Sequence, residues 1–338
     1  GDVHLKFNQF CAFAVYSKGK SNRYFVAYRM ADFKIGITDI QSNEVAAVLK
    51  GHTDHITEIR HYKSIKEINI LLSSSYDNTL LFWDLSTFKL SCVIKSNSWI
   101  LSSCITVLDD QEKVYFVGGF SKNSPIKFCE INLFYQIKNN TSITSTNSDR
   151  SSSNRRNNEP SLVCSLGKCG EIQLLDDTIP VIIEKYQKFK KNFLYVGTDN
   201  DNPYLFIIDL VTKQIIKSIK LTNVISSMTC FYSSNAIYLY TIDYFGTISE
   251  YDILKTKLNI EFNVGLNGTD VTLLDDYYMI SSGDKNNLKL IVRHKHRTSK
   301  VFDKTSDKII LNVQKLSTNI GQTILTLSAD KKIKLFKI

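Results

Sequence analysis

One sequence unit reads Leu49-Lys-Gly-His-Thr-Asp-His-Ile-Thr-Glu-Ile59 and continues, a few residues later, as Asn69-Ile-Leu-Leu-Ser-Ser-Ser-Tyr-Asp-Asn-Thr-Leu-Leu-Phe-Trp-Asp84. Apolar residues dominate both sides of a short polar segment around Asp77. Short apolar runs separated by turn residues are typical of antiparallel strands joined by tight turns. The unit therefore predicts a small, twisted β-sheet, opened by Gly51-His52 and closed at its third strand by Trp83-Asp84.

The combination of Gly51-His52 with Trp83-Asp84 resembles a WD repeat, the blade-forming unit of WD40 β-propellers. In that family a buried hydrogen-bonded chain runs from Trp to Ser or Thr, then to His and Asp. The resemblance implies that these roles fall on a structural tetrad: Trp83, Ser73, His52 and Asp77. A buried indole N–H and a buried imidazole need such partners. We therefore interpret His52 as a structural residue and not as a catalytic or metal-binding one.

Weaker copies of the Asp77-to-Asp84 interval recur along the chain, at residues 32–39, 202–209, 243–252, 284–292 and 330–337. Recurrence at this spacing predicts an all-β fold: a seven-bladed β-propeller of four-stranded antiparallel blades. We expect a single domain over residues 1–338, with blades at about 9–49, 50–95, 97–168, 169–222, 223–265, 266–304 and 305–338 plus 1–8.

The last blade lacks one strand. Its apolar runs begin at Ile309, Thr323 and Ile333, and no fourth run follows. Residues Val3-His-Leu-Lys-Phe7 alternate as a strand does. We predict that this N-terminal strand joins the C-terminal blade and closes the ring, which removes two exposed edges.

Residues 139–160 contain almost no apolar side chains, which predicts a disordered polar loop. The loop could carry phosphorylation sites or bind a partner, and it could equally be a tolerated insertion, since surface loops lengthen at little free-energy cost. The sequence leaves open whether residues 133–137 or 162–166 supply the fourth strand of the third blade.

Composition limits the class of protein. Hydrophobic residues make up 43% of the chain and charged residues 22%, which excludes general disorder. The seven cysteines are an odd number and most lie in apolar runs, and no signal peptide opens the chain. These features favour a reducing compartment, so we expect an intracellular protein, cytoplasmic or nuclear. The apolar runs are too short to span a membrane.

Catalytic motifs are absent from the sequence. It has six histidines but no Gly-x-Ser-x-Gly, no phosphate-binding glycine loop and no Cys-x-x-Cys. Cys164 and Cys169 alone are a weak metal signal, because structural zinc needs four ligands at characteristic spacing. We expect no enzymatic activity, no cofactor and no metal.

Protein binding is the function that the resemblance implies. In WD40 propellers, residues before the first strand of each blade and in the turn after its second strand line one face. Here that candidate protein-binding face comprises His55, Tyr76, Trp99, Asn223 and Tyr244. Exposed aromatic side chains are typical hot spots, although Trp99 could instead pack between blades. The leading hypothesis is a non-catalytic scaffold, a WD-repeat subunit of a larger multiprotein complex.

Two basic clusters support an alternative. The candidate anion-binding residues are Lys185, Lys188, Lys190 and Lys191 in one cluster, and Arg293, Lys295, Arg297 and Lys300 in the other. With a net charge of +9, they could bind nucleic acid, a ribonucleoprotein or a phosphoinositide membrane surface. The Phe-Arg-Arg-Gly sequence of phosphoinositide-binding propellers is absent, and exposed lysines commonly serve only as solvated surface.

Overall fold

A computed structural model describes residues 13–17, 23–42, 44–119, 122–136, 160–175, 177–188, 191–199, 201–232, 236–255, 257–265, 268–274, 278–283, 287–295, 297–302, 310–318, 321–328 and 333–337. Strands dominate these residues, and one short 3₁₀ helix, η2 (Arg293–Lys295), follows a strand late in the chain. The fold is all-β, as the sequence predicted.

The first three antiparallel sheets each contain four strands. The first sheet has β1 (Phe13–Ser17), β2 (Tyr24–Arg29), β3 (Ile35–Asp39) and β4 (Glu44–Leu49). The second has β5 (Ile56–Lys63), β6 (Asn69–Ser75), β7 (Thr79–Asp84) and β8 (Lys89–Lys95). The third has β9 (Ser102–Leu108), β10 (Gln111–Val117), β11 (Ile126–Gln136) and β12 (Ser161–Ile172).

The remaining described strands form four further antiparallel sheets. They are β13 (Pro180–Lys188), β14 (Lys191–Thr198), β15 (Tyr204–Asp209) and β16 (Gln214–Lys220); β17 (Ile225–Tyr232), β18 (Ile237–Asp243), β19 (Thr247–Asp252) and β20 (Lys257–Asn263); β21 (Val271–Leu273), β22 (Tyr278–Gly283), β23 (Asn287–Val292) and β24 (Arg297–Phe302); and β25 (Ile310–Thr318), β26 (Gly321–Ser328) and β27 (Ile333–Lys337).

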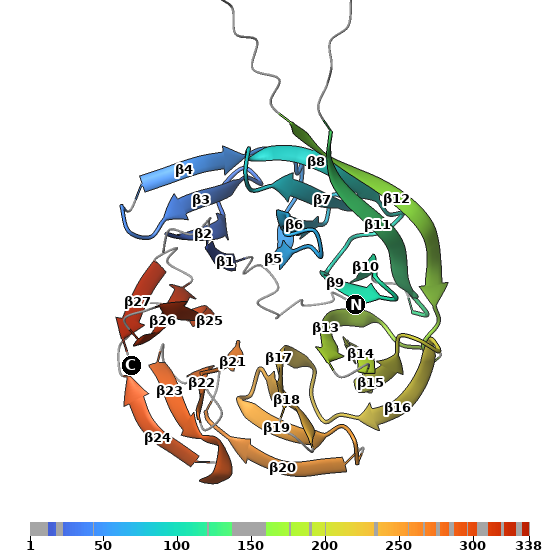
Figure 1. The fold of residues 1–338 in the computed structure, drawn as a ribbon. Coiled ribbons are helices and arrows are strands. Elements are labelled where there is room, and N and C mark those ends of the chain that lie inside the picture. The colour runs from blue at the N-terminus through green and yellow to red at the C-terminus, as the bar shows by residue number, and fades with distance from the viewer. Residues whose placement is uncertain are drawn as a thin grey trace, which may run out of the picture.

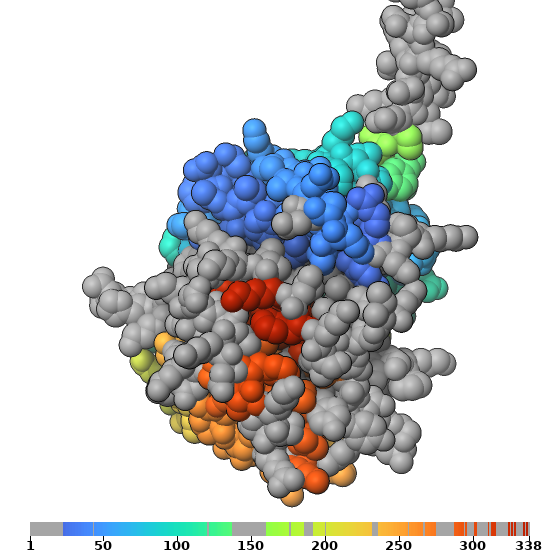
Figure 2. Space-filling model, turned by 90° about the vertical axis from the view of Figure 1, so that its left-hand side faces the viewer, coloured from blue at the N-terminus to red at the C-terminus, as the bar shows by residue number. Residues whose placement is uncertain are grey.

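The sheets follow one another around a common axis, with the first strand of each sheet innermost (Figure 1). The innermost strands contact one another in chain order, from β1 and β5 through β21 and β25, and β25 contacts β1. Figure 2 shows the same adjacency from the side, with the blue first sheet next to the red last one. Segments from opposite ends of the described chain are therefore neighbours.

The core is divided among the interfaces between successive sheets. Leu72 and Phe82 of the second sheet, for example, pack against Val114 and Ile131 of the third. Equivalent clusters lie at the other interfaces. Burying an apolar side chain of this size stabilises the fold by roughly 1.5–3 kcal/mol. The fold is therefore held together mainly by contacts between sheets, which sequence repeats alone do not reveal.

A recurring turn explains why the repeat keeps an aspartate at the end of its third strand. The carboxylate of Asp84 accepts hydrogen bonds from the Ser86 amide and hydroxyl. Three further aspartates accept hydrogen bonds from amides of the following turn, namely Asp39, Asp209 and Asp252. A side chain that satisfies a turn's amides favours that turn. The aspartate of each repeat thus shapes the hairpin to the outer strand.

A β-bulge between the third and fourth strands also recurs. It lies at Phe82/Trp83 in the second sheet and at equivalent places in five others, namely Ile37/Thr38, Cys129/Ile131, Ile207/Ile208, Glu250/Tyr251 and Leu290/Ile291. A bulge bends the strand and increases its local twist. The degenerate sequence units thus share one backbone design although they lack the Gly-His and Trp-Asp dipeptides.

The third sheet departs from the expected boundary at residue 168. Its outer strand β12 continues to Ile172, because β11 is long and pairs with it as far as Ile126. Residues between Gln136 and Pro160 therefore connect the third strand to the fourth, and β12 supplies the outer strand. The predicted loop falls outside the described residues except at Pro160, and the predicted closing strand at residues 3–7 falls wholly outside them.

Candidate functional site: an aromatic surface and the networks beneath it

The four residues of the predicted tetrad form one hydrogen-bonded chain in the second sheet. The Trp83 indole donates to the Ser73 hydroxyl over 2.9 Å, and Ser73 Oγ lies 2.7 Å from His52 Nε2. His52 Nδ1 lies 2.8 Å from the Asp77 carboxylate. Because an ionised carboxylate can only accept, Nδ1 carries the proton and Nε2 accepts from Ser73. Every polar atom of the imidazole is thus used inside the fold.

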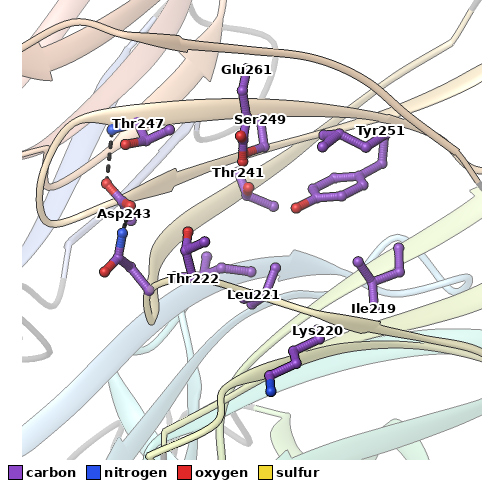
Figure 3. Close-up of a pocket in the computed structure, with 13 residues that line it drawn as sticks. Ile219, Lys220, Leu221, Thr222, Thr241, Asp243, Thr247, Ser249, Tyr251 and Glu261 are labelled. Carbon is purple, nitrogen blue, oxygen red and sulfur yellow. Dashed lines mark hydrogen bonds between the residues drawn. The ribbon is translucent and has the colours of Figure 1, made fainter.

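The equivalent place in the fifth sheet has different residues and a cavity. By strand register, Thr241 corresponds to Ser73 and Tyr251 to Trp83, while Leu221 stands where His52 would be. A cavity of about 180 Å³ lies there, between the fourth and fifth sheets (Figure 3). The Tyr251 phenol, which is shorter than an indole, hydrogen-bonds Thr241 and Ser249. The sequence did not indicate this cavity.

Four rings form a continuous row across the first three sheets, which we call the aromatic row. Phe33 meets His55 edge-on with ring centroids 5.3 Å apart, and His55 meets Tyr76 at 6.4 Å. Tyr76 and Trp99 are stacked, with centroids 4.6 Å apart. The rings lie before β5 and β9 and in the β2–β3 and β6–β7 turns, so that one end of the ring of sheets presents them together.

Exposure within the row differs from the expectation. Trp99 is 38% exposed, while Tyr76 is only 9% exposed and lies beneath it. Tyr76 also packs on Leu101 and Val181 from the third and fourth sheets. Tyr76, which the sequence placed on the exposed face, therefore supports Trp99 from below, because the sequence cannot show which of two stacked rings faces outward. Trp99 and the exposed His55 form the accessible part.

The other two residues of the predicted face belong to the fifth sheet. Asn223 donates its side-chain amide to the Asp243 carboxylate over 2.8 Å. Tyr244 is half-buried and touches Phe245, whose ring is 51% exposed. Val224 joins the apolar cluster around Tyr76, which links this second patch to the aromatic row. Phe33 and Phe245 lie in the repeat units at residues 32–39 and 243–252, and sequence reasoning did not assign either ring to the face.

Charged residues link the innermost strands of the second, third and fourth sheets. The Arg60 guanidinium contacts the carboxylates of Glu58 and Glu184 at 2.8 and 3.1 Å. Glu58 accepts a hydrogen bond from the Ser103 amide over 2.7 Å. Burial opposes the charge on Arg60, but the two carboxylates raise its pKa above the ordinary value. Half-buried and paired with two carboxylates, Arg60 links strands of neighbouring sheets.

In the first basic cluster, the Lys185 side chain points toward the interior of the fold. The Lys185 ammonium donates to the Ile105 carbonyl and lies 5.1 Å from the centre of the Tyr62 ring. Burial lowers the pKa of Lys185. A lysine whose donors and charge are used internally is poorly suited to bind external phosphate. Lys188 and Lys191 lie in β13 and β14, and Lys190 lies outside the described residues.

In the second basic cluster, Arg293 is likewise an internal residue. Arg293 is 4% exposed, and its guanidinium stacks 3.3 Å from the centre of the Phe231 ring and hydrogen-bonds the Tyr240 hydroxyl. Lys295 is exposed, and Arg297 and Lys300 lie in β24. The candidate anion-binding set therefore divides between two sheets, and two of its members are internal residues.

A buried carboxyl group joins the innermost strands of the last three sheets. Asp270 accepts hydrogen bonds from the Ser227 hydroxyl at 2.5 Å and the Val313 amide at 2.7 Å. Burial outweighs these hydrogen bonds and raises the pKa of Asp270 to about 6. Sequence reasoning missed this residue, since it precedes a three-residue strand with no motif.

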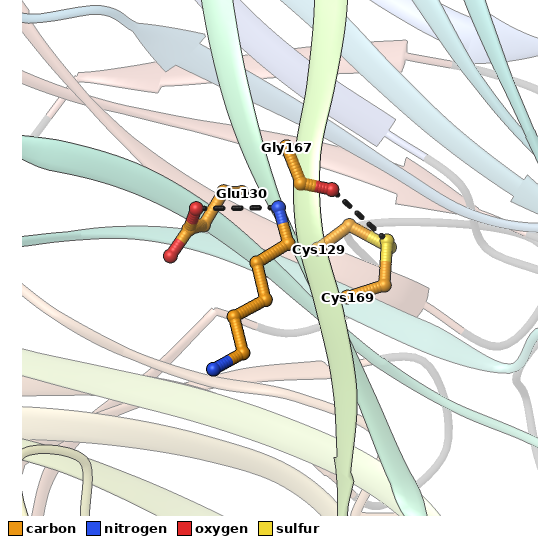
Figure 4. Close-up of a disulfide and its surroundings, with 5 residues drawn as sticks. Cys129, Glu130, Gly167 and Cys169 are labelled. Carbon is orange, nitrogen blue, oxygen red and sulfur yellow. Dashed lines mark hydrogen bonds between the residues drawn. A yellow bond between two sulfur atoms is a disulfide. The ribbon is translucent and has the colours of Figure 1, made fainter.

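Two of the described cysteines are not the free thiols that a reducing compartment predicts. Cys129 on β11 and Cys169 on β12 are direct cross-strand partners and form a disulfide (Figure 4). Cys164 and Cys169 do not approach as a pair of metal ligands, and the described residues contain no group of three or more side chains that could hold a metal ion.

The described helix is too short to cross a membrane.

Comparison with known proteins gives the fold class. No protein-family model matches the chain, and no curated protein matches its sequence. Among solved structures it is similar to the β-propeller domain of Myceliophteria thermophila Cps50 (Swd1), with a TM-score of 0.67 over 96% of each chain and 16% sequence identity. The chain therefore has the β-propeller fold. The resemblance to WD40 propellers is confirmed at the level of that fold.

Proposed function

We propose that the protein is a non-catalytic scaffold, a WD-repeat subunit of a larger assembly, whose partners dock on the aromatic row. The single observation that supports this most directly is the stacked pair of Tyr76 and Trp99, with its outer ring 38% exposed. A rigid aromatic ring supported from below is a typical interface hot spot, because little conformational entropy is lost when a partner covers it.

The chemistry of the buried groups supports a non-catalytic role. His52 uses both ring nitrogens in the chain to Asp77 and Ser73. Burial raises the pKa of the Cys104 thiol to about 12, which opposes formation of a nucleophilic thiolate. These groups serve the fold. Four further cysteines, Cys92, Cys104, Cys164 and Cys230, are free thiols, and we propose an intracellular location on that basis.

We also propose that the propeller has seven blades in one domain and that residues 1–8 complete the last one. Six described sheets have four strands, whereas the sheet of β25, β26 and β27 has three. A strand added beside β27 would cover an exposed edge. Deleting residues 1–8 should lower the thermal midpoint sharply. A deletion variant that melts like the parent would contradict the proposed closure.

The scaffold proposal is tested with the tagged full chain in native lysate. Trp99→Ala should abolish recovery of stoichiometric protein partners, while Val211→Ala should leave it unchanged. Val211 is the matched control because it is 61% exposed but lies in the turn after β15, away from the row. Partners retained equally by both variants would contradict docking on the aromatic row.

The salt dependence of binding distinguishes the alternative, an anion-binding function, from the scaffold function. Binding to phosphate through Z contacts weakens steeply, with a slope of about −0.9Z in log K against log salt for duplex DNA. Contacts anchored by aromatic rings change little. Partners that survive high salt support the scaffold. Recovery of RNA or lipid that is lost in salt, without protein partners, would favour the basic clusters despite the internal positions of Lys185 and Arg293.

A further inference from the structure

Four cysteines gather at the interface between the second and third sheets. Cys129 belongs to the apolar cluster that fills this interface, and Cys92 and Cys164 pack against the same cluster. Cys169 is joined to Cys129 by the disulfide. Cys92 lies on β8 and Cys164 on β12, the outer strands of two different sheets, and these strands are in contact. The sequence separates these residues widely, and only the packing of the sheets unites them.

The two free thiols of this group are direct neighbours. The Cys164 thiol and the Cys92 sulfur hydrogen-bond each other across the interface. Both residues are half-buried, in contrast to the buried Cys104. The hydrogen bond from Cys164 lowers the pKa of Cys92, while the same contact and burial raise that of Cys164. Cys92 is therefore the better nucleophile.

We propose that Cys92 and Cys164 are an oxidation site: a low-molecular-weight disulfide converts them into a disulfide that links β8 to β12. The inference does not depend on the proposed scaffold function. It rests on the contact of two accessible thiols on the outer strands of adjacent sheets.

The reaction is a thiol–disulfide exchange in two steps. The Cys92 thiolate attacks one sulfur of the oxidant RSSR, forming a mixed disulfide and releasing RS⁻. Cys164 then loses its proton to the released RS⁻ and attacks the Cys92 sulfur, which expels the second RS⁻. The protein loses two electrons and two protons, and one RSSR becomes two RSH. The resulting bond spans two sheets, whereas Cys129–Cys169 lies within one.

The bond would reinforce contacts that already hold the long β11–β12 hairpin against the second sheet. The Lys66 ammonium donates to the Asn132 side chain over 2.7 Å, and the Tyr135 hydroxyl donates to Asp84 over 3.2 Å. The first pair is solvent-exposed, whereas the second is partly buried, because Asp84 is a buried residue. A covalent link between sheets restricts the unfolded chain and should raise the thermal midpoint by about 5 °C.

Trypsin makes the test unambiguous, because it places the four cysteines in four peptides: residues 90–95, 128–138, 157–168 and 169–185. The native full chain is incubated with oxidised glutathione, alkylated with N-ethylmaleimide, digested without reduction and analysed by mass spectrometry. We expect peptide 90–95 linked to peptide 157–168, with 128–138 still linked to 169–185. Recovery of 90–95 and 157–168 as separate alkylated peptides, or linkage of 157–168 to 169–185, would overturn the proposal.

Serine variants separate the two steps while preserving side-chain size. Cys164→Ser should accumulate glutathione on Cys92, because the second thiol is missing. Cys92→Ser should likewise stop at a single glutathione, on Cys164, because the contact with Cys92 that raises the pKa of Cys164 is removed and no second thiol can complete the exchange. Neither oxidised variant should show the rise in thermal midpoint. In the parent chain, quenched with acid early in the reaction, the mixed disulfide should lie on Cys92; a mixed disulfide found on Cys164 would contradict the assignment of Cys92 as the nucleophile.

Discussion

His52 Nδ1 lies 2.8 Å from the Asp77 carboxylate, which ties the segment before β5 to the turn between β6 and β7. Burial alone would raise the pKa of Asp77, but hydrogen bonds from His52, Thr79 and the Thr53 amide lower it to about 2. A carboxyl group whose folded-state pKa lies below its unfolded value stabilises the fold above the unfolded pKa. This stabilisation is lost as pH falls from about 4 through 2.

Asp77→Asn should remove that part of the acid dependence. The free energy of unfolding of the parent, measured by urea titration at several pH values, should fall between pH 4 and pH 2 more steeply than that of the variant. The variant should be less stable at pH 7, because its amide cannot accept both bonds. Parallel pH profiles for the two proteins would contradict the ionised His52–Asp77 contact.

Removing either end of the hydrogen-bonded chain should destabilise the second sheet. His52→Ala leaves the Ser73 hydroxyl and Asp77 short of a partner and should cost about 1–3 kcal/mol. Trp83→Ala also creates a cavity beside Gly51, whose added Cβ would lie 2.8 Å from the indole, and should cost about 3–5 kcal/mol. Denaturant unfolding of the single and double variants measures these losses. Because both residues bond Ser73, the two effects should be non-additive; strict additivity would contradict a shared network.

The raised pKa of Asp270 predicts a pH dependence of stability opposite to that of Asp77. Its pKa is raised to about 6 by burial, so the folded state favours the protonated form. Stability therefore falls as pH rises from about 4 through 6, by about 3 kcal/mol for a shift of this size. Asp270→Asn should abolish this slope whatever its effect on absolute stability. Thermal midpoints between pH 4 and pH 7 provide the measurement, and an unchanged slope in the variant would assign the titration elsewhere.

Arg293 and Lys295 offer a matched pair of cations in η2. Arg293→Ala removes a guanidinium stacked on Phe231 and bonded to Tyr240, and should destabilise by about 2–4 kcal/mol. Lys295→Ala changes an exposed side chain and should lie within about 0.5 kcal/mol of the parent. Urea unfolding of both variants tests the difference. Two equally small losses of stability would indicate that Arg293 is not buried, and it would again be a candidate anion ligand.

The cavity of the fifth sheet can be used to test the equivalence with the second. The double variant Leu221→His, Tyr251→Trp places an imidazole and an indole around Thr241, where Ser73 stands in the second sheet. Filling the space of about 180 Å³ and completing the hydrogen bonds should stabilise by about 1 kcal/mol. Leu221→His alone should destabilise, because the buried ring lacks its indole-bonded partner. If the double variant is no more stable than Leu221→His, the two sites are not equivalent.

Sequence motifs were sufficient to predict the hydrogen-bonded residues of the second sheet, but not those of the other sheets. The Gly51-His52 and Trp83-Asp84 dipeptides resemble a WD repeat, and that resemblance predicted which four residues would meet. The degenerate units share the turn aspartates and bulges but have Leu221 or Tyr251 in place of the key side chains. Strand β12 continues to Ile172, past the expected boundary near residue 168, because strand length follows from the pairing of β11 with β12, which leaves no mark in either strand alone.

The sequence by itself determined an all-β chain of repeated antiparallel sheets, since short-range periodicity and turn chemistry act within a few residues. The composition of one hydrogen-bonded network followed from the resemblance of one unit to a WD repeat. Tertiary structure alone decided which polar side chains are internal. Arg293, Lys185 and Asp270 belong to different repeats from the groups that surround them, and Cys92 meets Cys164 only because two sheets pack together. The physical reason is that burial and charge pairing depend on neighbours contributed by other sheets, and no local pattern encodes that contact.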